Sequence, residues 1–338
     1  MTLIIHAPNV HQGGGRTLLL SVLEAAGNSP CIAILDERIE LPQHFPPSMV
    51  VMRVPPTLAG RLIGEWQLQR LAGPEHTVLC FGNLPPLFCI AGRVRVFLQN
   101  RYLVGRCDLS IFPLRTRLRL IVERAWLRFR LTHRIQLLVQ APSMAREMEI
   151  EFGIQVRTVP FLPSHTFDDT LEIPRRFDFI YVASGEPHKN HRRLVEAWQL
   201  LASEGIYPTL CLTLDRGKDR RLLEWIESQS LEKCLRIENV GTVSRAELER
   251  LYRMSAALIY PSISESFGLP LLEAAKAGLP IIASELDYVR DVSVPEQTFD
   301  PNSAASIARA IRRYMDVAES VVQPLTPAAF LDAVNAQD

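Results

Sequence analysis

The sequence repeats one pattern along most of its 338 residues, in which short apolar runs of strand length alternate with longer amphipathic stretches of helix length. This alternation is typical of parallel sheets, because a crossover helix must return the chain to the start of each next strand. Six runs of this kind occupy the first half, at residues 3–7, 31–35, 50–54, 78–81, 94–98 and 137–140. The pattern therefore predicts an α/β fold.

The series breaks once and then resumes. A proline-containing stretch that ends near Pro174 and includes Asp168 and Asp169 interrupts it, and a second alternating series follows from residue 177. Since a domain takes about 150 residues, we predict two tandem Rossmann-like domains, with a ligand cleft at the carboxyl ends of their strands. The predicted divisions are residues 1–165, residues 175–310, and C-terminal helices within residues 311–338 that pack back on the first domain.

Composition excludes several classes of protein. Apolar residues make up 47% of the chain and charged residues 22%, which is typical of a globular protein and excludes disorder, collagen and coiled coil. Lys plus Arg and Asp plus Glu each total 37, so overall charge does not indicate a nucleic-acid partner. No basic leader or 18-residue apolar run is present, and the six cysteines are scattered, so we expect buried, reduced thiols and a cytoplasmic protein.

One segment of the second half places two glutamates around a helix start. A strand ends at Tyr260, a loop carries Glu265, and a helix begins at Gly268 with Pro270 in its first turn. The free N–H groups and the positive dipole end of such a helix bind anions. Glu273 follows Glu265 by eight residues, and a carboxylate accepts hydrogen bonds from two vicinal hydroxyls. The segment predicts a site for a sugar and a ribose with phosphates between them; the alternative is a solvated helix with two ordinary glutamates.

This segment resembles the Glu-x7-Glu signature of the retaining glycosyltransferases of family four, the group 1 glycosyltransferases. The chain also has a Glu-Pro-His-Lys-Asn loop at 186–190 and Gln-Asn-Arg at 99–101, in which it is similar to members that build bacterial surface polysaccharides. The resemblance implies a GT-B fold, in which the donor cleft lies between two Rossmann-like domains. It also implies that Glu273 binds the donor ribose and that Glu265 contacts the donor sugar. The backbone at Phe267, Gly268 and Leu269 would hold the diphosphate.

A second loop carries the first of only four lysines in the chain. Lys189 follows the strand at 177–182 and precedes a helix, where a compact ammonium can neutralise a departing nucleoside diphosphate. The alternative is a surface lysine near a helix cap. The family carries a lysine in this loop, with an arginine five or six residues before it, whereas this chain has Ser184 and Ala183 there. The loop still assigns Ser184 to the donor site, and the second phosphate cation stays open, with three candidates: His188, Arg192 and Arg216.

A glycine cluster follows the first strand. The resemblance places Gly14 and Gly15 against the donor, where glycine lets the backbone approach closely, although a plain tight turn is the alternative. The cluster fails the dinucleotide fingerprint, because Leu18 occupies the third glycine position counted from Gly13. Asp36, which follows Gly15 by 21 residues, keeps an NAD-dependent dehydrogenase as a minor alternative.

Two further loops are assigned by the resemblance. The family often has a histidine near the transferred sugar, but this chain has Gln99 and Asn100, which bind hydroxyls of sugar or acceptor without titrating. This suits a retaining mechanism in which the leaving phosphate takes the acceptor proton. The loop before Ser244 would hold the nucleobase through Val243. His188 and the histidine three residues later lack a third ligand, so we expect no metal and no cofactor besides the nucleoside-diphosphate sugar as co-substrate.

Basic residues gather between Arg93 and Arg134, where the chain has 11 arginines and two acidic residues. The segment Arg115–Arg134 is helical in pattern and carries Trp126 and Phe129 among its aliphatic residues. Such a helix either lies on an anionic membrane or packs its apolar stripe on the sheet with solvated arginines outside. The segment lacks a nucleic-acid-binding module, so we expect no nucleic-acid partner.

Together with these features, the resemblance implies a metal-independent, retaining hexosyltransferase that moves a sugar, with mannose among the candidates, from a nucleoside-diphosphate donor to a glycan or lipid-linked acceptor. The expected setting is bacterial polysaccharide or lipopolysaccharide biosynthesis, in the cytoplasm or peripherally on the inner face of the plasma membrane. Two alternatives stay open: a nucleotide-sugar epimerase of the same fold and a non-catalytic nucleotide-sugar-binding protein. An essential titratable side chain with activity on donor alone would indicate the epimerase.

Overall fold

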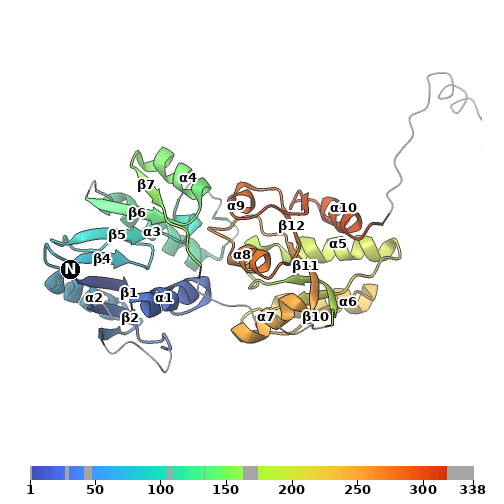
Figure 1. Ribbon diagram of the computed structural model, residues 1–338, viewed down its shortest axis with the longest axis horizontal. Coiled ribbons are helices and arrows are strands. Elements are labelled where there is room, and N and C mark those ends of the chain that lie inside the picture. The colour runs from blue at the N-terminus through green and yellow to red at the C-terminus, as the bar shows by residue number, and fades with distance from the viewer. Residues whose placement is uncertain are drawn as a thin grey trace, which may run out of the picture.

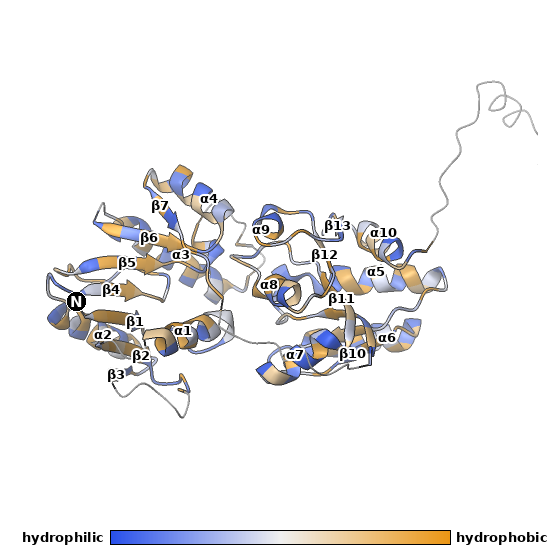
Figure 2. Cartoon of the chain, viewed as in Figure 1, coloured by the Kyte–Doolittle hydropathy of each residue, from blue (hydrophilic) through white to orange (hydrophobic). Residues whose placement is uncertain are grey.

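The structure is a computed structural model that describes residues 2–26, 30–41, 48–104, 109–110, 112–132, 134–162 and 174–317. Over these residues the chain forms two sheets, each with its own helices, that lie end to end (Figure 1). Every strand pair is parallel, and the strands are the apolar cores of both halves (Figure 2). The predicted α/β class with two Rossmann-like units is confirmed.

The first sheet has seven strands in the order β3-β2-β1-β4-β5-β6-β7. Its strands are β1 Leu3–Ala7, β2 Cys31–Asp36, β3 Met49–Val54, β4 Thr77–Cys80, β5 Arg93–Phe97, β6 Ile135–Val139 and β7 Val156–Thr158. Its helices are α1 Gly13–Ala26, α2 Leu58–Leu71, α3 Leu114–Arg130 and α4 Pro142–Phe152, with the short 3-10 helix η1 Arg101–Leu103.

The second sheet has six strands in the order β10-β9-β8-β11-β12-β13. Its strands are β8 Phe177–Tyr181, β9 Leu210–Leu212, β10 Ile237–Asn239, β11 Ser255–Tyr260, β12 Ile281–Ser284 and β13 Gln297–Phe299. Its helices are α5 His191–Ser203, α6 Arg220–Lys233, α7 Arg245–Arg253, α8 Leu269–Lys276, α9 Asp287–Arg290 and α10 Ala304–Tyr314, with the 3-10 helix η2 Pro187–Lys189.

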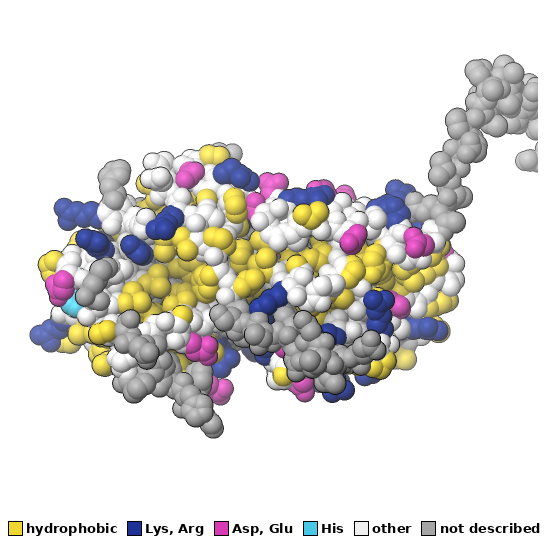
Figure 3. Space-filling view, viewed as in Figure 1, with side chains coloured by type: hydrophobic (Ala, Val, Ile, Leu, Met, Phe, Trp, Pro, Cys, Tyr) yellow, Lys and Arg dark blue, Asp and Glu magenta, His cyan; other side chains and the backbone are white. Residues whose placement is uncertain are grey.

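Alternate residues of the first sheet face different helices. Ile5 of β1 belongs to a buried cluster with Leu19 of α1, whereas its neighbour Ile4 belongs to a cluster with Leu68 of α2 and Leu127 of α3. Because successive side chains of a strand point to opposite faces, α1 lies on one face of the sheet, and α2 and α3 lie on the other. On the face that Figure 3 shows, hydrophobic side chains gather over this sheet, and basic side chains lie around its edge.

Helix α3 has two apolar sides. Leu120 and Leu127 are buried against the sheet, as the packing alternative required. Leu114, Leu118 and Phe129, however, are 79%, 64% and 84% exposed. Packing on the sheet therefore accounts for only one of the apolar sides of this arginine-rich helix.

Five short elements were not predicted: β7, β13, α9 and the 3-10 helices η1 and η2. Each has three or four residues, which is too few to show a period in the sequence. Both strands lie at sheet edges, where each is identified by its pairing with a single neighbouring strand.

The predicted C-terminal arrangement is corrected where the structure describes it. Helix α10 packs on α5 of the second unit, not on the first domain, and the Tyr314 hydroxyl donates to the carbonyl of Ala256 over 2.9 Å. The helix predicted at 328–334, Cys107 and the proposed division near residue 165 lie outside the described residues. No helix in the described ranges combines the length and apolar character needed to cross a membrane.

Candidate active site

A cleft of about 750 Å³ opens between the carboxyl ends of the two sheets. It is lined by loops of both units, as expected where parallel strands of two α/β units end facing one another. Every residue that the sequence assigned to the donor or acceptor lies along this cleft, although their individual roles stay predictions. These residues are Gly14, Gly15, Gln99, Asn100, Ser184, Lys189, Val243, Glu265, Phe267, Gly268, Leu269 and Glu273.

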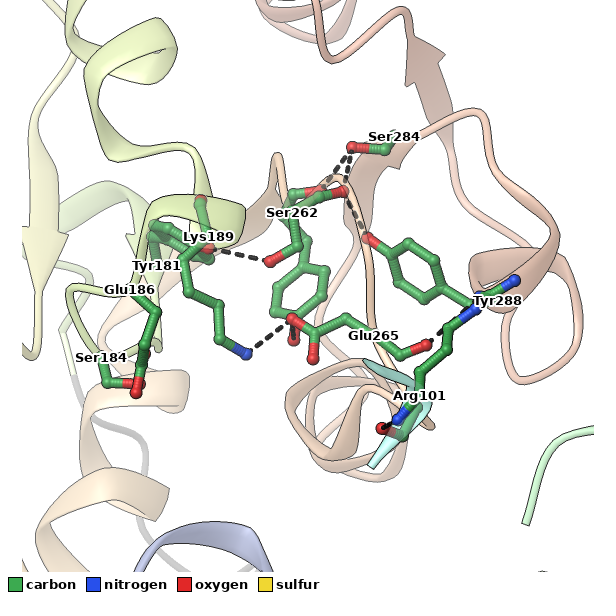
Figure 4. Close-up of polar contacts among 11 residues, drawn as sticks. Arg101, Tyr181, Ser184, Glu186, Lys189, Ser262, Glu265, Ser284 and Tyr288 are labelled. Carbon is green, nitrogen blue, oxygen red and sulfur yellow. Dashed lines mark hydrogen bonds and ion pairs between the residues drawn. The ribbon is translucent and has the colours of Figure 1, made fainter. Parts of the chain in front are cut away.

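Lys189 and Glu265 form an ion pair in the cleft (Figure 4). The Lys189 ammonium lies 2.7 Å from Glu265 Oε1, and the Tyr260 hydroxyl donates to the same oxygen over 2.9 Å. Burial raises the pKa of Tyr260 well above its usual value, so this hydroxyl stays protonated and keeps donating. The ammonium is therefore fixed at the cleft by a carboxylate that is itself held in place.

Hydrogen bonds from buried hydroxyl groups hold the loop that carries Glu265. The Tyr181 hydroxyl donates to the Lys189 carbonyl over 2.6 Å and lies 3.0 Å from Ser262 Oγ (Figure 4). Ser284 and Tyr288 both donate to the Ser262 carbonyl, over 3.0 and 2.8 Å. Buried hydroxyls with satisfied partners make this side of the cleft rigid.

The same loop reaches into the first unit. Phe267 is packed in the hydrophobic cluster of the first sheet, and a Cβ on Gly14 would lie 3.2 Å from Leu269. Arg101 donates its backbone N–H to Ser266 Oγ over 3.2 Å and a guanidinium N–H to the Glu265 carbonyl over 3.3 Å. The two walls of the cleft are therefore in direct contact at this loop.

Gly268 precedes helix α8 in the left-handed conformation, with φ at +74°. A Cβ at this position would lie 2.9 Å from Leu271 Cδ1, so a larger residue meets both strain and a clash. Pro270 lacks an N–H and occupies the first turn of the helix. Since Gly268 and Leu269 line the cleft, the positive end of α8 is directed at the space where an anion would bind.

Replacing Gly268 with alanine should therefore impair both folding and ligand binding. The left-handed conformation costs an L residue about 1–2 kcal/mol, and the added methyl must displace Leu271. Gly278→Ala is the matched control, because Gly278 has φ +67° at the other end of α8 and no heavy atom within 4 Å. Thermal unfolding measures the effect of each variant on stability, and nucleotide titration measures its effect on binding. Binding should be weaker only for Gly268→Ala; equal binding in the two variants would contradict this account of the helix start.

Glu273 lies in the second turn of α8 and is buried. Arg245 Nη1 donates to its Oε1 over 2.8 Å, and the Tyr252 hydroxyl donates to its Oε2 over 3.1 Å. Burial raises the pKa of Tyr252 well above its usual value, so this donor also stays protonated. Each carboxylate oxygen keeps further acceptor capacity, so hydroxyls of a ligand can still bind Glu273.

Two loops, at the carboxyl ends of β9 and β10, are tied together by hydrogen bonds to Asp215. Thr242 donates its hydroxyl to Asp215 over 3.1 Å, and backbone N–H groups of Gly217 and Lys218 donate to the same carboxylate over 2.8 Å. These bonds hold the pKa of Asp215 below its usual value. They fix the loop in which Val243 lines the cleft.

The opposite wall comes from the first unit. Asn83 accepts the backbone N–H groups of Gln99 and Asn100 over 2.6 and 2.9 Å, which fixes the loop after β5. The Gln99 side chain donates to the Phe81 carbonyl over 3.3 Å, and a Cβ on Gly15 would lie 3.5 Å from Gln99 Oε1. Gln99 and the glycine loop therefore lie next to one another.

The three candidates for the second phosphate cation do not line the cleft. His188 packs its ring against Tyr102 at 5.4 Å, and burial, aided by Lys189, lowers its pKa, so it carries no charge at neutral pH. The Arg192 guanidinium lies over the Trp225 ring at 4.5 Å. Arg216 is exposed outside the lining.

The structure instead brings Arg16 and Arg245 to the cleft, and the sequence reasoning missed both. Arg16 follows the glycine cluster directly, and Arg245 follows the Ser244 cap, so their proximity to two assigned loops was the available signal. Arg16 is bound only loosely among the described residues: its contacts are a 3.3 Å hydrogen bond to the Glu40 carbonyl and a 4.0 Å ion pair with the exposed Glu40 carboxylate.

Asp36 is not available for a dinucleotide ribose. It is fully buried, and the Arg38 guanidinium donates to its two oxygens over 2.8 and 2.6 Å. It does not line the cleft. The dehydrogenase alternative therefore loses the residue on which it depended. Over the described residues, no three His, Cys, Asp or Glu side chains are grouped as metal ligands.

Comparison with known proteins agrees with this geometry. The family described as glycosyl transferases group 1 matches residues 165–323. O-antigen chain mannosyltransferase B of Escherichia coli is 33% identical over 135 residues, which are 39% of this chain and 35% of that protein. The serotype-specific mannosyltransferase WbdA of Escherichia coli is 31% identical over 150 residues, 43% of this chain and 18% of that protein. The chain thus matches about a third or less of the length of these relatives.

Solved structures match over a larger share of the chain. Anabaena Alr3699/HepE in complex with UDP and glucose has a TM-score of 0.69 at 15% identity, over 94% of this chain and 90% of that one. WaaG, a glycosyltransferase involved in lipopolysaccharide biosynthesis, has a TM-score of 0.67 at 16% identity over the same shares. At these identities the likeness concerns the fold. The chain therefore has the GT-B fold, and its residues 165–323 match the family of group 1 glycosyl transferases.

Proposed function

We propose that this chain is a retaining glycosyltransferase of bacterial polysaccharide biosynthesis. It would move a hexosyl group from a nucleoside-diphosphate donor to a hydroxyl of a glycan or lipid-linked acceptor, without a metal ion. The observation that carries the proposal is the convergence of Lys189, Glu265, Glu273 and the start of α8 on one cleft lined by both units. Mannose is the leading candidate for the sugar, since two relatives over 30% identical are mannosyltransferases.

On this proposal, the donor binds with its negatively charged diphosphate at the start of α8. The free N–H groups there and the Lys189 ammonium stabilise the diphosphate, which gains negative charge as it leaves. Arg16 supplies the second cation, because it lines the cleft and has only the weak contacts with Glu40 described above. Glu273 holds the ribose, Glu265 the sugar and the Val243 loop the base.

The reaction exchanges one bond at the anomeric carbon. The bond from this carbon to the leaving phosphate oxygen breaks, a bond to the acceptor hydroxyl oxygen forms on the same face, and the acceptor proton passes to the leaving phosphate. This route needs no side-chain base, which fits Gln99 and Asn100 on the acceptor wall. Gly14 and Gly15 line the cleft, and without side chains their backbone would be open to contact with sugar or phosphate.

Proton NMR of candidate donors, including GDP-mannose and UDP-glucose, tests the proposal with simple alkyl glycosides or water as acceptor. We expect one donor to be consumed, with release of its diphosphate and a product that keeps the donor's anomeric configuration, equally with and without EDTA. An inverted product contradicts retention, and inhibition by EDTA contradicts metal independence. Conversion of the donor to an epimer without diphosphate release would favour the epimerase.

A further inference from the structure

Helix α3 has an apolar stripe on the side that does not pack on the sheet. Leu114, Leu118, Ile121, Val122 and Phe129 recur at helical spacing along this side, so they share one face. Their exposed fractions run from 53% for Ile121 to 84% for Phe129. The stripe follows most of the 17-residue helix, which spans about 25 Å.

Helix α2 presents a similar stripe beside it. Four large apolar residues of α2 are exposed by 49% to 87%: Leu58, Leu62, Ile63 and Trp66. The two helices lie next to each other on the same face of the first sheet, since the Arg61 guanidinium of α2 lies 5.2 Å from the Trp126 ring of α3. The two stripes therefore form one surface, which we call the α2–α3 face.

The α2–α3 face has more large apolar side chains, gathered on two adjacent helices, than scattered surface exposure explains. Isolated exposed apolar residues are normal on a protein surface, but nine large ones on two adjacent helices indicate a contact with another body. The inner sides of both helices are already buried, through Leu68 of α2 and through Leu120 and Leu127 of α3. These outward side chains are therefore additional to the residues that hold the helices on the sheet.

The charges on these helices identify the partner. Helices α2 and α3 together carry eight arginines and two glutamates, and neither glutamate is exposed: Glu65 is buried, and Glu123 is 22% exposed beside Arg119. Arg119 and Arg128, although paired with Glu123 and with Glu151 of α4, are 66% and 64% exposed, and Glu151 is 18% exposed. Apolar side chains flanked by arginines suit an anionic lipid surface, where the former enter the headgroup region and the latter contact phosphates.

We propose that the α2–α3 face docks the protein on an anionic bilayer. A second copy of the chain is disfavoured as the partner, because two faces rich in arginine and without exposed acids would repel one another. Trp66 is suited to the interface between headgroups and acyl chains. Docking through these side chains requires no change in the fold, since they already point to solvent.

Helix α3, which forms part of the α2–α3 face, is linked by contacts to residues beside the cleft. Helix α3 follows Phe112, whose ring lies 6.5 Å from that of His188, and Arg124 of α3 donates to the Tyr102 carbonyl over 2.8 Å. Tyr102 in turn belongs to η1, where Arg101 contacts the Glu265 loop. A bilayer on this face would hold a lipid-linked acceptor near the site; this consequence rests on the proposed function, but the docking does not.

Flotation of the full chain with vesicles tests the docking. The vesicles contain phosphatidylcholine alone or with about one-third phosphatidylglycerol, in about 0.1 M salt. We expect binding at least about tenfold stronger to the anionic vesicles, and a loss of about tenfold or more in L118E/I121E and in R115E/R119E. Raising the salt to about 1 M, where screening acts within about 3 Å, should weaken the preference for anionic vesicles.

Matched variants of the second unit serve as controls. L231E/V294E places the same charges at apolar residues that are 83% and 90% exposed, and R220E/R221E reverses two exposed arginines of α6. Both should bind vesicles as the wild type does, with thermal unfolding unchanged in all four variants. Equal binding to neutral and anionic vesicles would overturn the proposal. So would a dimer in solution that L118E/I121E converts to a monomer, because the face would then belong to a second copy.

Discussion

Replacing Lys189 with methionine is expected to lower kcat by about 10²–10³-fold while changing the donor Kd by less than about tenfold. Methionine keeps much of the length of the side chain but removes the positive charge. The ammonium lies 2.7 Å from Glu265 and lines the cleft. Its main contribution should come when the diphosphate leaves, because negative charge on the phosphate is then largest. Steady-state kinetics with the identified donor, together with a separate Kd for its diphosphate, measures the two effects.

Lys233→Met is the matched control for Lys189. Lys233 is half-exposed at the end of α6, pairs with Glu232 over 2.9 Å and is absent from the cleft lining. Its replacement should leave both kcat and Kd unchanged. If Lys189→Met turns over within about twofold of the wild type, the ammonium does not act on the leaving group, and its pairing with Glu265 is structural.

Replacing Glu273 with alanine is expected to raise the Kd of the donor by about 10- to 100-fold, with little change in kcat at saturation. A hydrogen bond from a neutral ribose hydroxyl to a charged acceptor is worth about 1.5–3 kcal/mol, so the net loss of one such bond gives a change in Kd of this size. Because the ribose is far from the reacting carbon, its contribution should be similar in the ground and transition states. Isothermal titration with the nucleoside diphosphate that binds the wild type gives the Kd directly.

Arg245 complicates the effect of Glu273→Ala, because this arginine loses its 2.8 Å partner. Glu249→Ala is the matched control: Glu249 lies 3.7 Å from Arg245 but does not line the cleft. The control should bind the diphosphate within about twofold of the wild type. Equal Kd values for Glu273→Ala and the wild type would remove Glu273 from the donor site.

The fold could be predicted because its signal is long and repeated. Each strand of the two central regions is a short apolar run, and each crossover helix is amphipathic, so α/β character is visible without any tertiary information. The edge strands β7 and β13 have three residues each and no period, so only their pairing defines them. Helix α3 could be predicted as amphipathic, but a helical period cannot tell which of two apolar sides packs on the sheet.

The candidate site could be predicted wherever a residue follows a strand directly. Lys189, Glu265 and Gln99 all lie in the segments that follow the carboxyl ends of parallel strands, and such segments meet at the same edge. The second cation could not be found in this way, because its location depends on how the two units face each other. His188 neighbours Lys189 in sequence but is buried against Tyr102, whereas Arg16 comes from the opposite unit.

The most direct measurement is thermal unfolding of the purified chain with UDP, GDP, ADP, dTDP or NAD, each with and without EDTA, for the wild type and Glu273→Ala. A ligand at about 100 times its Kd adds about 2.7 kcal/mol of stability, which raises Tm by several degrees for a chain of this size. We expect one nucleoside diphosphate to raise Tm of the wild type, regardless of EDTA, and to lose this effect in the variant. Stabilisation by NAD alone, or by none of these ligands, would contradict a nucleotide-sugar site in this cleft.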